Sequence, residues 1–201
     1  MNQTVLKTEV ALVEEEVARA GVYGLIGALL AAAPDSAVFD LLEAVTASPN
    51  DTDLPWQEIK TAAANADSDA VVDEYHALFI GIGRGELLPY ASTYLTGFLQ
   101  EQPLADVRKD LARLGFARQA GVHEPEDHAG ALCQVMAALV ASPEEFSFDD
   151  QHVFFSQHIG PWMGEFFSDL AAAEQADFYQ SVARFGLAFI EIEKRYFSME
   201  I

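Results

Sequence analysis

The chain has 201 residues, of which 51% are hydrophobic and 21% charged, so it can bury a core and is not intrinsically disordered as a whole. With 11 Lys and Arg against 32 Asp and Glu, its formal net charge is −21, which repels phosphate backbones and anionic lipid head groups. The sequence therefore predicts no nucleic-acid partner and no stable membrane insertion. A basic partner, such as an Arg- or Lys-rich peptide, is favoured instead.

Apolar residues recur at helical spacing along nearly the whole chain, and no sustained two-residue alternation points to strands. We expect an all-α fold, a bundle of roughly nine to ten helices. The predicted helices lie at about 10–33, 36–47, from 56 onwards, 70–80, 90–99, 104–113, 125–140, 149–158, 162–173 and from 178 towards the end. Ser36 is the expected cap of the second of these helices, and Pro125 the expected first residue of the seventh.

The chain is predicted to form a single domain over 1–201, with an N-terminal subregion 1–118 and a C-terminal subregion 125–201. Ten of the 14 phenylalanines lie between Phe146 and Phe197, which predicts a separate aromatic core in the C-terminal part. The loop 115–124 is the candidate hinge between them. A monomer and a dimer that exchanges its C-terminal halves are both compatible with such a hinge.

Two features bear on the compartment of the protein. The most apolar stretch, Val22 to Ala33, is shorter than the about 20 residues needed to span a bilayer, and mostly acidic residues precede it, unlike the start of an export leader. Cys133 is the one cysteine and has no partner for an internal disulfide. We therefore expect a cytoplasmic protein.

Two local clusters invite a chemical interpretation. The three glycines from Gly81 to Gly85 lack a phosphate-binding motif and are better explained as a turn that ends a helix. The cluster from His123 to His128 is rich in titratable groups, but Pro125 stands where a helical carboxylate-bridged metal site needs Glu three residues before His128. No Ser or Cys lies beside a plausible base. The sequence therefore predicts a protein that is not an enzyme and that has no metal or other cofactor.

Three short motifs together are similar to a known family. The segments 74–81 (EYHALFIG) and 89–95 (PYASTYL) resemble the aromatic-x-x-Leu-Phe and Pro-x-x-Ser-x-Tyr elements of the TorD/DmsD/NarJ family of redox-enzyme maturation chaperones. The segment 124–128 (EPEDH) resembles the Glu-Pro-x-Asp-His signature of that family. Ala91 departs from the family pattern, because many relatives carry an acidic residue there.

The resemblance implies a TorD-like helical fold and a cytoplasmic, cofactor-free chaperone for a molybdoenzyme. Such a chaperone binds the twin-arginine leader and the apo form of a molybdenum-cofactor oxidoreductase catalytic subunit, assists cofactor insertion and delays export. The peptide-binding residues that the resemblance implies form two walls. One wall consists of Tyr75, Leu78, Phe79, Pro89, Ser92 and Tyr94, and the other of Glu124, Pro125, Asp127 and His128.

The chemistry of these residues suits such a leader, which carries two arginines followed by an apolar stretch. Asp127 or Glu124 can accept a bidentate guanidinium contact, while Tyr75, Leu78 and Phe79 form either an apolar peptide-binding wall or ordinary core packing. His128 orients Asp127, senses pH or makes a structural hydrogen bond. Two alternatives remain open: a helical metalloprotein that uses the His123–His128 cluster, and a non-catalytic helical adaptor.

Overall fold

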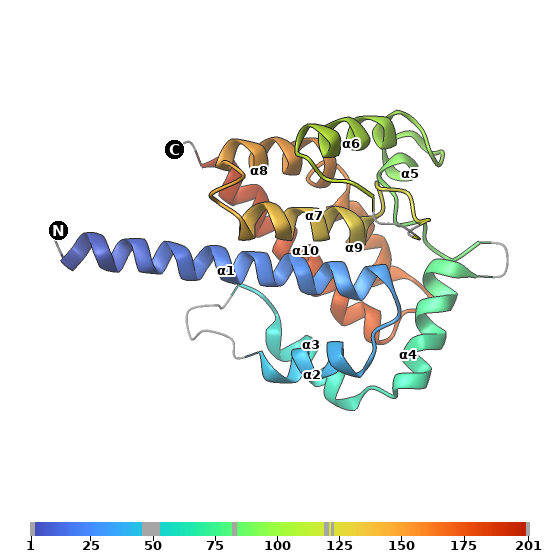
Figure 1. Ribbon diagram of the computed structural model, residues 1–201. Helices are drawn as coiled ribbons and strands as arrows, with labels where there is room; N and C mark the ends of the chain where they lie inside the picture. The colour runs from blue at the N-terminus through green and yellow to red at the C-terminus, as the bar shows by residue number, and fades with distance from the viewer. Residues whose placement is uncertain (1–2, 46–52, 82–83, 119–120, 122, 200–201) are drawn as a thin grey trace.

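The computed structural model describes residues 3–45, 53–81, 84–118, 121 and 123–199, and all regular elements in these ranges are helical (Figure 1). Ten α-helices and two π-helical turns lie in this part of the chain, which confirms the all-α prediction. The N-terminal helices are α1 (Gln3–Ala31), α2 (Ser36–Ala44) and α3 (Trp56–Asn65). The expected loop at 48–55 lies partly outside the described residues.

The start of α2 differs from the expectation in its cap. Asp35, not Ser36, is the N-cap residue, and its side chain accepts a hydrogen bond from the Val38 amide at 3.1 Å. Pro34 precedes it and prevents α1 from continuing. Consequently α1 and α2 meet in a short, sharp connection.

Helix α4 (Ser68–Tyr75) continues directly into the π-helical turn η1 (His76–Ile80). The helix ends at Gly81, whose φ of +60° suits glycine, and an added Cβ there would lie 1.9 Å from the Arg84 carbonyl oxygen. The chain then folds back, so that the Leu87 amide donates to the Leu78 carbonyl at 2.8 Å. The glycine-rich segment is therefore a helix-ending turn, as the sequence predicts; Ile82 and Gly83 within it lie outside the described residues.

The second half of the chain holds the remaining helices. They are α5 (Ala91–Thr96), α6 (Gln102–Arg113), α7 (Ala129–Ala141), α8 (Phe148–Phe154) with the π-helical turn η2 (Phe155–Ile159), α9 (Met163–Ala172) and α10 (Phe178–Ser198). Helix α5 is shorter than expected because Gly97 adopts a left-handed conformation with φ +83°. Helix α7 begins at residue 129 instead of 125, because Glu126 and Asp127, which lie before it, bond to other parts of the chain.

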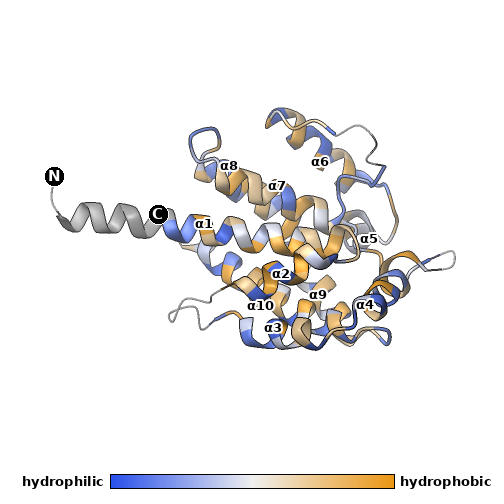
Figure 2. Cartoon of the chain, turned by 60° about the horizontal axis from the view of Figure 1, so that its bottom comes forward, coloured by the Kyte–Doolittle hydropathy of each residue, from blue (hydrophilic) through white to orange (hydrophobic). Residues whose placement is uncertain are grey.

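Helices α1 and α7 pack along each other at the centre of the bundle, and α9 packs on α10 (Figure 1). Glycines permit the close approach of α1 and α7: a Cβ on Gly130 would lie 2.9 Å from the Ala31 nitrogen and 3.0 Å from the Gly27 oxygen. Most helices present one apolar and one polar face (Figure 2), as expected of helices that surround a common core.

The predicted separate aromatic core in the C-terminal part is wrong. All buried apolar residues of the described part of the chain except Leu104 form one cluster that runs from Val22 to Phe197. Tyr23 of α1 meets Phe189 of α10 with ring centroids 4.7 Å apart, and Trp56 of α3 meets Phe185 of α10 at 4.5 Å. Because α10 packs against the N-terminal helices, both subregions share their core. Part of the candidate hinge lies outside the described residues.

A buried ion pair also joins the two ends of the chain. The guanidinium of Arg19 on α1 donates to both carboxylate oxygens of Glu193 on α10, at 2.9 and 2.8 Å. The Tyr23 hydroxyl donates to the same carboxylate at 2.7 Å. Burial opposes the charge of Arg19, but the hydrogen bond and the charge of Glu193 outweigh it and raise the pKa of Arg19.

Within the described ranges, no helix has the length and apolarity needed to cross a bilayer.

Candidate functional site

Two motif segments far apart in the sequence lie side by side in the structure. The Ala91 amide donates to the Asp127 carbonyl at 3.0 Å, and the Ala129 amide donates to the Pro89 carbonyl at 2.8 Å. The paired bonds form an isolated antiparallel bridge between Tyr90 and His128. The helix that was expected from Pro125 cannot form here, because these backbone groups bond across to the residues before α5.

Asp127 fixes the start of α5 from inside the protein. Only 1% of its surface is exposed, and its Oδ2 accepts hydrogen bonds from the Ser92 amide at 2.9 Å and from the Ser92 hydroxyl. A carboxylate at a helix N-terminus is also favoured by the helix dipole. The second oxygen, Oδ1, is buried without a hydrogen-bond partner in the described part of the chain. Asp127 therefore holds the two motif segments together.

His128 is the N-cap residue of α7. Its Nδ1 accepts a hydrogen bond from the Gly130 amide at 3.1 Å, and its ring lies edge-on to Tyr90 with centroids 5.2 Å apart. Burial lowers the pKa of His128, although the charges of Glu124 and Asp127 oppose this shift. Three roles were open for His128: orienting Asp127, sensing pH, or making a structural hydrogen bond. The structure contains the last of these, the bond from the Gly130 amide.

Glu124 is the one acidic member of the predicted set that is exposed. The Tyr90 hydroxyl donates to its carboxylate. Burial and then this hydrogen bond raise the pKa of Tyr90. Burial, assisted by the charge of Glu124, also raises the pKa of Tyr75 to about 12. Tyr75, Tyr90 and Glu124 therefore share one neighbourhood. Tyr90 was absent from the predicted set, although it stands between the motif residues Pro89 and Ser92.

The first predicted wall is mostly buried, as are two members of the second. Buried members of the predicted set are Tyr75, Leu78, Phe79, Pro89, Ser92, Asp127 and His128, while Tyr94 and Pro125 are half-buried. The Tyr75 hydroxyl donates to the Leu30 carbonyl at 3.2 Å, and the Phe79 ring contacts Tyr179 with centroids 5.4 Å apart. Of the two interpretations of Tyr75, Leu78 and Phe79, the structure places these side chains in the core beneath the motif.

Tyr94 borders a separate concavity of about 340 Å³. Its hydroxyl donates to the Asp169 carboxylate at 3.0 Å, and its pKa is raised by burial and by the charge of Asp169. Glu86 and Glu165 also line this concavity. This acidic set had no local signal in the sequence, because Glu86 lies far along the chain from Glu165 and Asp169 of α9.

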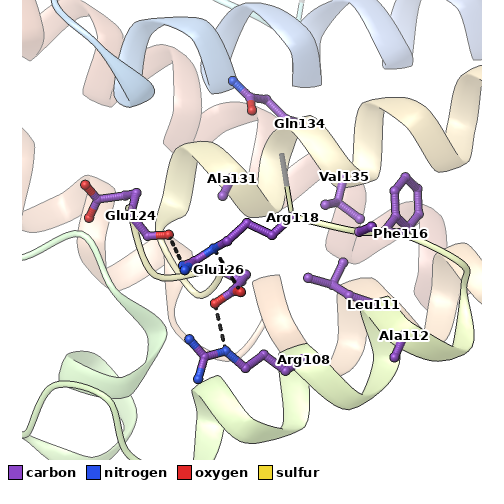
Figure 3. A pocket seen from close by; sticks show the side chains of 11 residues that line it. Arg108, Leu111, Ala112, Phe116, Arg118, Glu124, Glu126, Ala131, Gln134 and Val135 are labelled. Carbon is purple, nitrogen blue, oxygen red and sulfur yellow. Dashed lines mark hydrogen bonds and ion pairs between the residues drawn. The ribbon is translucent and has the colours of Figure 1, made fainter. Parts of the chain in front are cut away.

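A second concavity, of about 360 Å³, lies between α6 and α7 and includes Glu124 (Figure 3). Leu111, Phe116 and Val135 contribute apolar side chains to it. Glu126 at its edge pairs with Arg108 at 2.9 Å and with Arg118 at 3.2 Å. The exposed Glu124 lies at the opposite end of this hollow from its apolar side chains, with its carboxylate turned away from them (Figure 3).

The described residues contain no group of three or more His, Cys, Asp or Glu side chains placed to bind a metal ion. In the His123–His128 cluster, Asp127 bonds to Ser92 and the Nδ1 of His128 accepts from Gly130. Cys133 is buried, and burial raises the pKa of its thiol to about 12. No observation therefore favours the metalloprotein alternative.

Comparison with a solved structure defines the class of fold. The crystal structure of a redox enzyme maturation protein from Archaeoglobus fulgidus superimposes with a TM-score of 0.60 at 21% sequence identity, and the match covers 86% of this chain and 93% of that one. The all-helical architecture is thus that of a redox enzyme maturation protein fold.

Sequence comparison places the chain in a family. Residues 46–168 match the model of the nitrate reductase delta subunit family, and the chain belongs to this family. It is also 30% identical over 126 residues to the chaperone protein TorD of Vibrio cholerae, covering 58% of this chain and 57% of the relative. The TorD of Aliivibrio fischeri is 26% identical over 132 residues, covering 61% of both chains. The matched stretch spans less than two thirds of either relative.

Proposed function

We propose that this protein is a cytoplasmic chaperone that binds the twin-arginine leader of a molybdenum-cofactor oxidoreductase catalytic subunit. It holds the apo form of that subunit, assists insertion of the cofactor and delays export until insertion is complete. The relatives named as TorD chaperones and the motifs from Tyr75 to His128 support this proposal.

The observation that carries the proposal is the exposed carboxylate of Glu124 beside the hollow between α6 and α7. A guanidinium group binds a carboxylate through two charge-assisted hydrogen bonds, which are stronger than neutral ones. Nearby ion pairs go to Glu126, and none in the described part of the chain goes to Glu124. Glu124 is therefore available to an arginine of the leader.

The other motif residues support this carboxylate from within. Asp127 and Ser92, with Pro89, fix the bridge that presents residues 124–128, and His128 caps the helix that follows. Tyr75, Leu78 and Phe79 form the packed base beneath them, and Pro125 fixes the turn. Tyr94 lines the separate concavity with Glu86, Glu165 and Asp169, whose three carboxylates outnumber the one arginine there and add to the negative field that attracts a cationic peptide.

Removal of the charge at Glu124 tests the proposal. We expect Glu124→Gln to weaken binding of a synthetic twin-arginine leader by about tenfold, since a hydrogen bond to a charged group contributes about 1.5–3 kcal/mol. Glu43→Gln is the matched control, because Glu43 is exposed on α2, which packs on α3 and not on the helices that line the hollow. Binding is measured by fluorescence anisotropy of the labelled peptide. Equal affinities of the Glu124→Gln variant and the wild type would contradict the assigned role of Glu124.

A further inference from the structure

The concavity between α6 and α7 has an open apolar floor. Its volume is about 360 Å³, and apolar side chains from both helices and from the segment between them line it. Leu111, Phe116 and Val135 are half-buried, so part of each side chain faces the hollow. On its other side, Phe116 stacks on Phe146 with ring centroids 5.5 Å apart. This contact holds the Phe116 ring in place at one end of the floor.

The two ends of this hollow differ in chemistry. Figure 3 shows Phe116, Val135 and Leu111 gathered at one end, and Glu124 at the other with its carboxylate turned away from them. Arg118 lies between the two ends, where its Nη2 donates to the Glu124 carbonyl at 2.6 Å. Arg118 thus ties the segment after α6 to residues 124–126. The hollow therefore has a fixed apolar end and a fixed charged end.

The charges around the hollow cancel, unlike those of the rest of the molecule. Arg108 and Arg118 both pair with the Glu126 carboxylate, and Glu124 also lines the hollow, so the lining carries two positive and two negative charges. The whole chain carries −21. Binding of an apolar peptide segment is most favourable on apolar surface without net charge, because apolar area leaves water and no charged group has to lose its hydration. Cationic residues gain most beside a carboxylate such as that of Glu124, which bonds to the Tyr90 hydroxyl but pairs with no cation in the described part of the chain.

From this polarity we infer that the hollow between α6 and α7 seats the apolar segment of the leader, in the direction that places the preceding arginines at Glu124. The inference rests on the proposed function and adds the seat and the orientation of the bound peptide. A partner in which apolar residues directly follow an arginine fits this hollow, because Glu124 lies at one end of it and the apolar side chain of Phe116 at the other. Burial of the apolar residues then adds affinity to the guanidinium contact.

Val135→Gln places a polar group in the floor and tests the inference directly. We expect it to weaken leader binding by about tenfold, because the polar amide replaces an aliphatic contact with the apolar segment of the leader. Ala112→Gln is a second variant: Ala112 is exposed at the edge of the hollow, so its replacement leaves folding intact, and we expect about threefold weaker binding. Ala141→Gln, at the exposed end of α7, is the control and should bind like the wild type.

A second peptide separates this inference from the proposed function. In it, the apolar residues after the two arginines are replaced by serine, and its affinity should be equal for the wild type and for Val135→Gln. If both Val135→Gln and Ala112→Gln bind the intact leader as the wild type does, the seat is elsewhere and the proposed function stands. If the wild type binds no leader, both fall. If Val135→Gln changes only the oligomeric state, as measured by light scattering, the hollow serves a second copy and the inference is overturned.

Discussion

The Asp127 carboxylate accepts two hydrogen bonds from Ser92, one from the backbone amide at 2.9 Å and one from the side-chain hydroxyl. Both residues are almost completely buried. This contact joins the residues before α7 to the first turn of α5. The exposed Glu124 lies three residues before Asp127 in the same segment. The buried pair therefore determines where Glu124 is presented.

Ser92→Ala removes one of the two donors to a buried charge. We expect the free energy of unfolding to fall by about 1–3 kcal/mol, since Asp127 loses a charge-assisted hydrogen bond in the interior. Urea denaturation followed by circular dichroism measures this loss. Ser198→Ala is the control, because its hydroxyl is exposed and bonds only to the Arg195 carbonyl. A loss no larger than that of the control would show that the Ser92 hydroxyl does not stabilise Asp127.

The His128 cap predicts a pH dependence of stability. Its Nδ1 accepts from Gly130 only when unprotonated, and burial lowers the pKa of His128. In the unfolded chain histidine has a pKa of about 6.5. The unfolded state therefore binds more protons below that pH, and stability falls there by up to about 1.4 kcal/mol per pH unit. Above about pH 6.5 the contribution of His128 is constant.

The variant His128→Asn keeps an N-cap acceptor but does not titrate in this range. We expect its free energy of unfolding to change less between pH 7.5 and 5.5 than that of the wild type. Urea titrations at several pH values give both curves. Parallel curves for the two proteins would rule out His128 as a source of the pH dependence.

Glu193→Gln tests the ion pair that joins α1 to α10. The change removes one of the two carboxylates that pair with the buried Arg19, while Glu16 still pairs with it at 2.8 Å, and the loss of a hydrogen bond to a charged group costs about 1.5–3 kcal/mol. On the same helix, Glu191→Gln removes an exposed pair with Lys194 and should cost at most about 1 kcal/mol. Thermal unfolding of both variants compares the two sites. Similar losses in the two would show that the buried pair contributes no special stability.

Helical periodicity predicted the all-α fold and the number of helices well, because each helix carries its own apolar face. It failed where a helix boundary depends on tertiary contacts. Pro125 has the character of a helix start, but Asp127 bonds to Ala91 and Ser92, and α7 begins only at Ala129, whose amide donates to the Pro89 carbonyl. The predicted C-terminal aromatic core failed for a similar reason, because α10 buries its phenylalanines against helices from the other end of the chain.

The motifs indicated which segments belong together, but not which side chains face solvent. Tyr75, Leu78 and Phe79 follow a helical spacing that fits a peptide-binding wall and a core equally well, and the structure buries them. The apolar hollow beyond Glu124 had no local signal. Leu111 and Val135 come from helices separated by a loop, and their proximity is set by packing.

Titration of a synthetic twin-arginine leader into the wild-type protein tests the central proposal most directly. We expect saturable binding that weakens as salt rises from 50 to 500 mM, because salt screens the attraction between the leader and the acidic protein. We also expect a loss of about tenfold or more in affinity when both arginines are replaced by glutamine. A leader without its arginines that binds equally well, with no dependence on salt, would contradict the account.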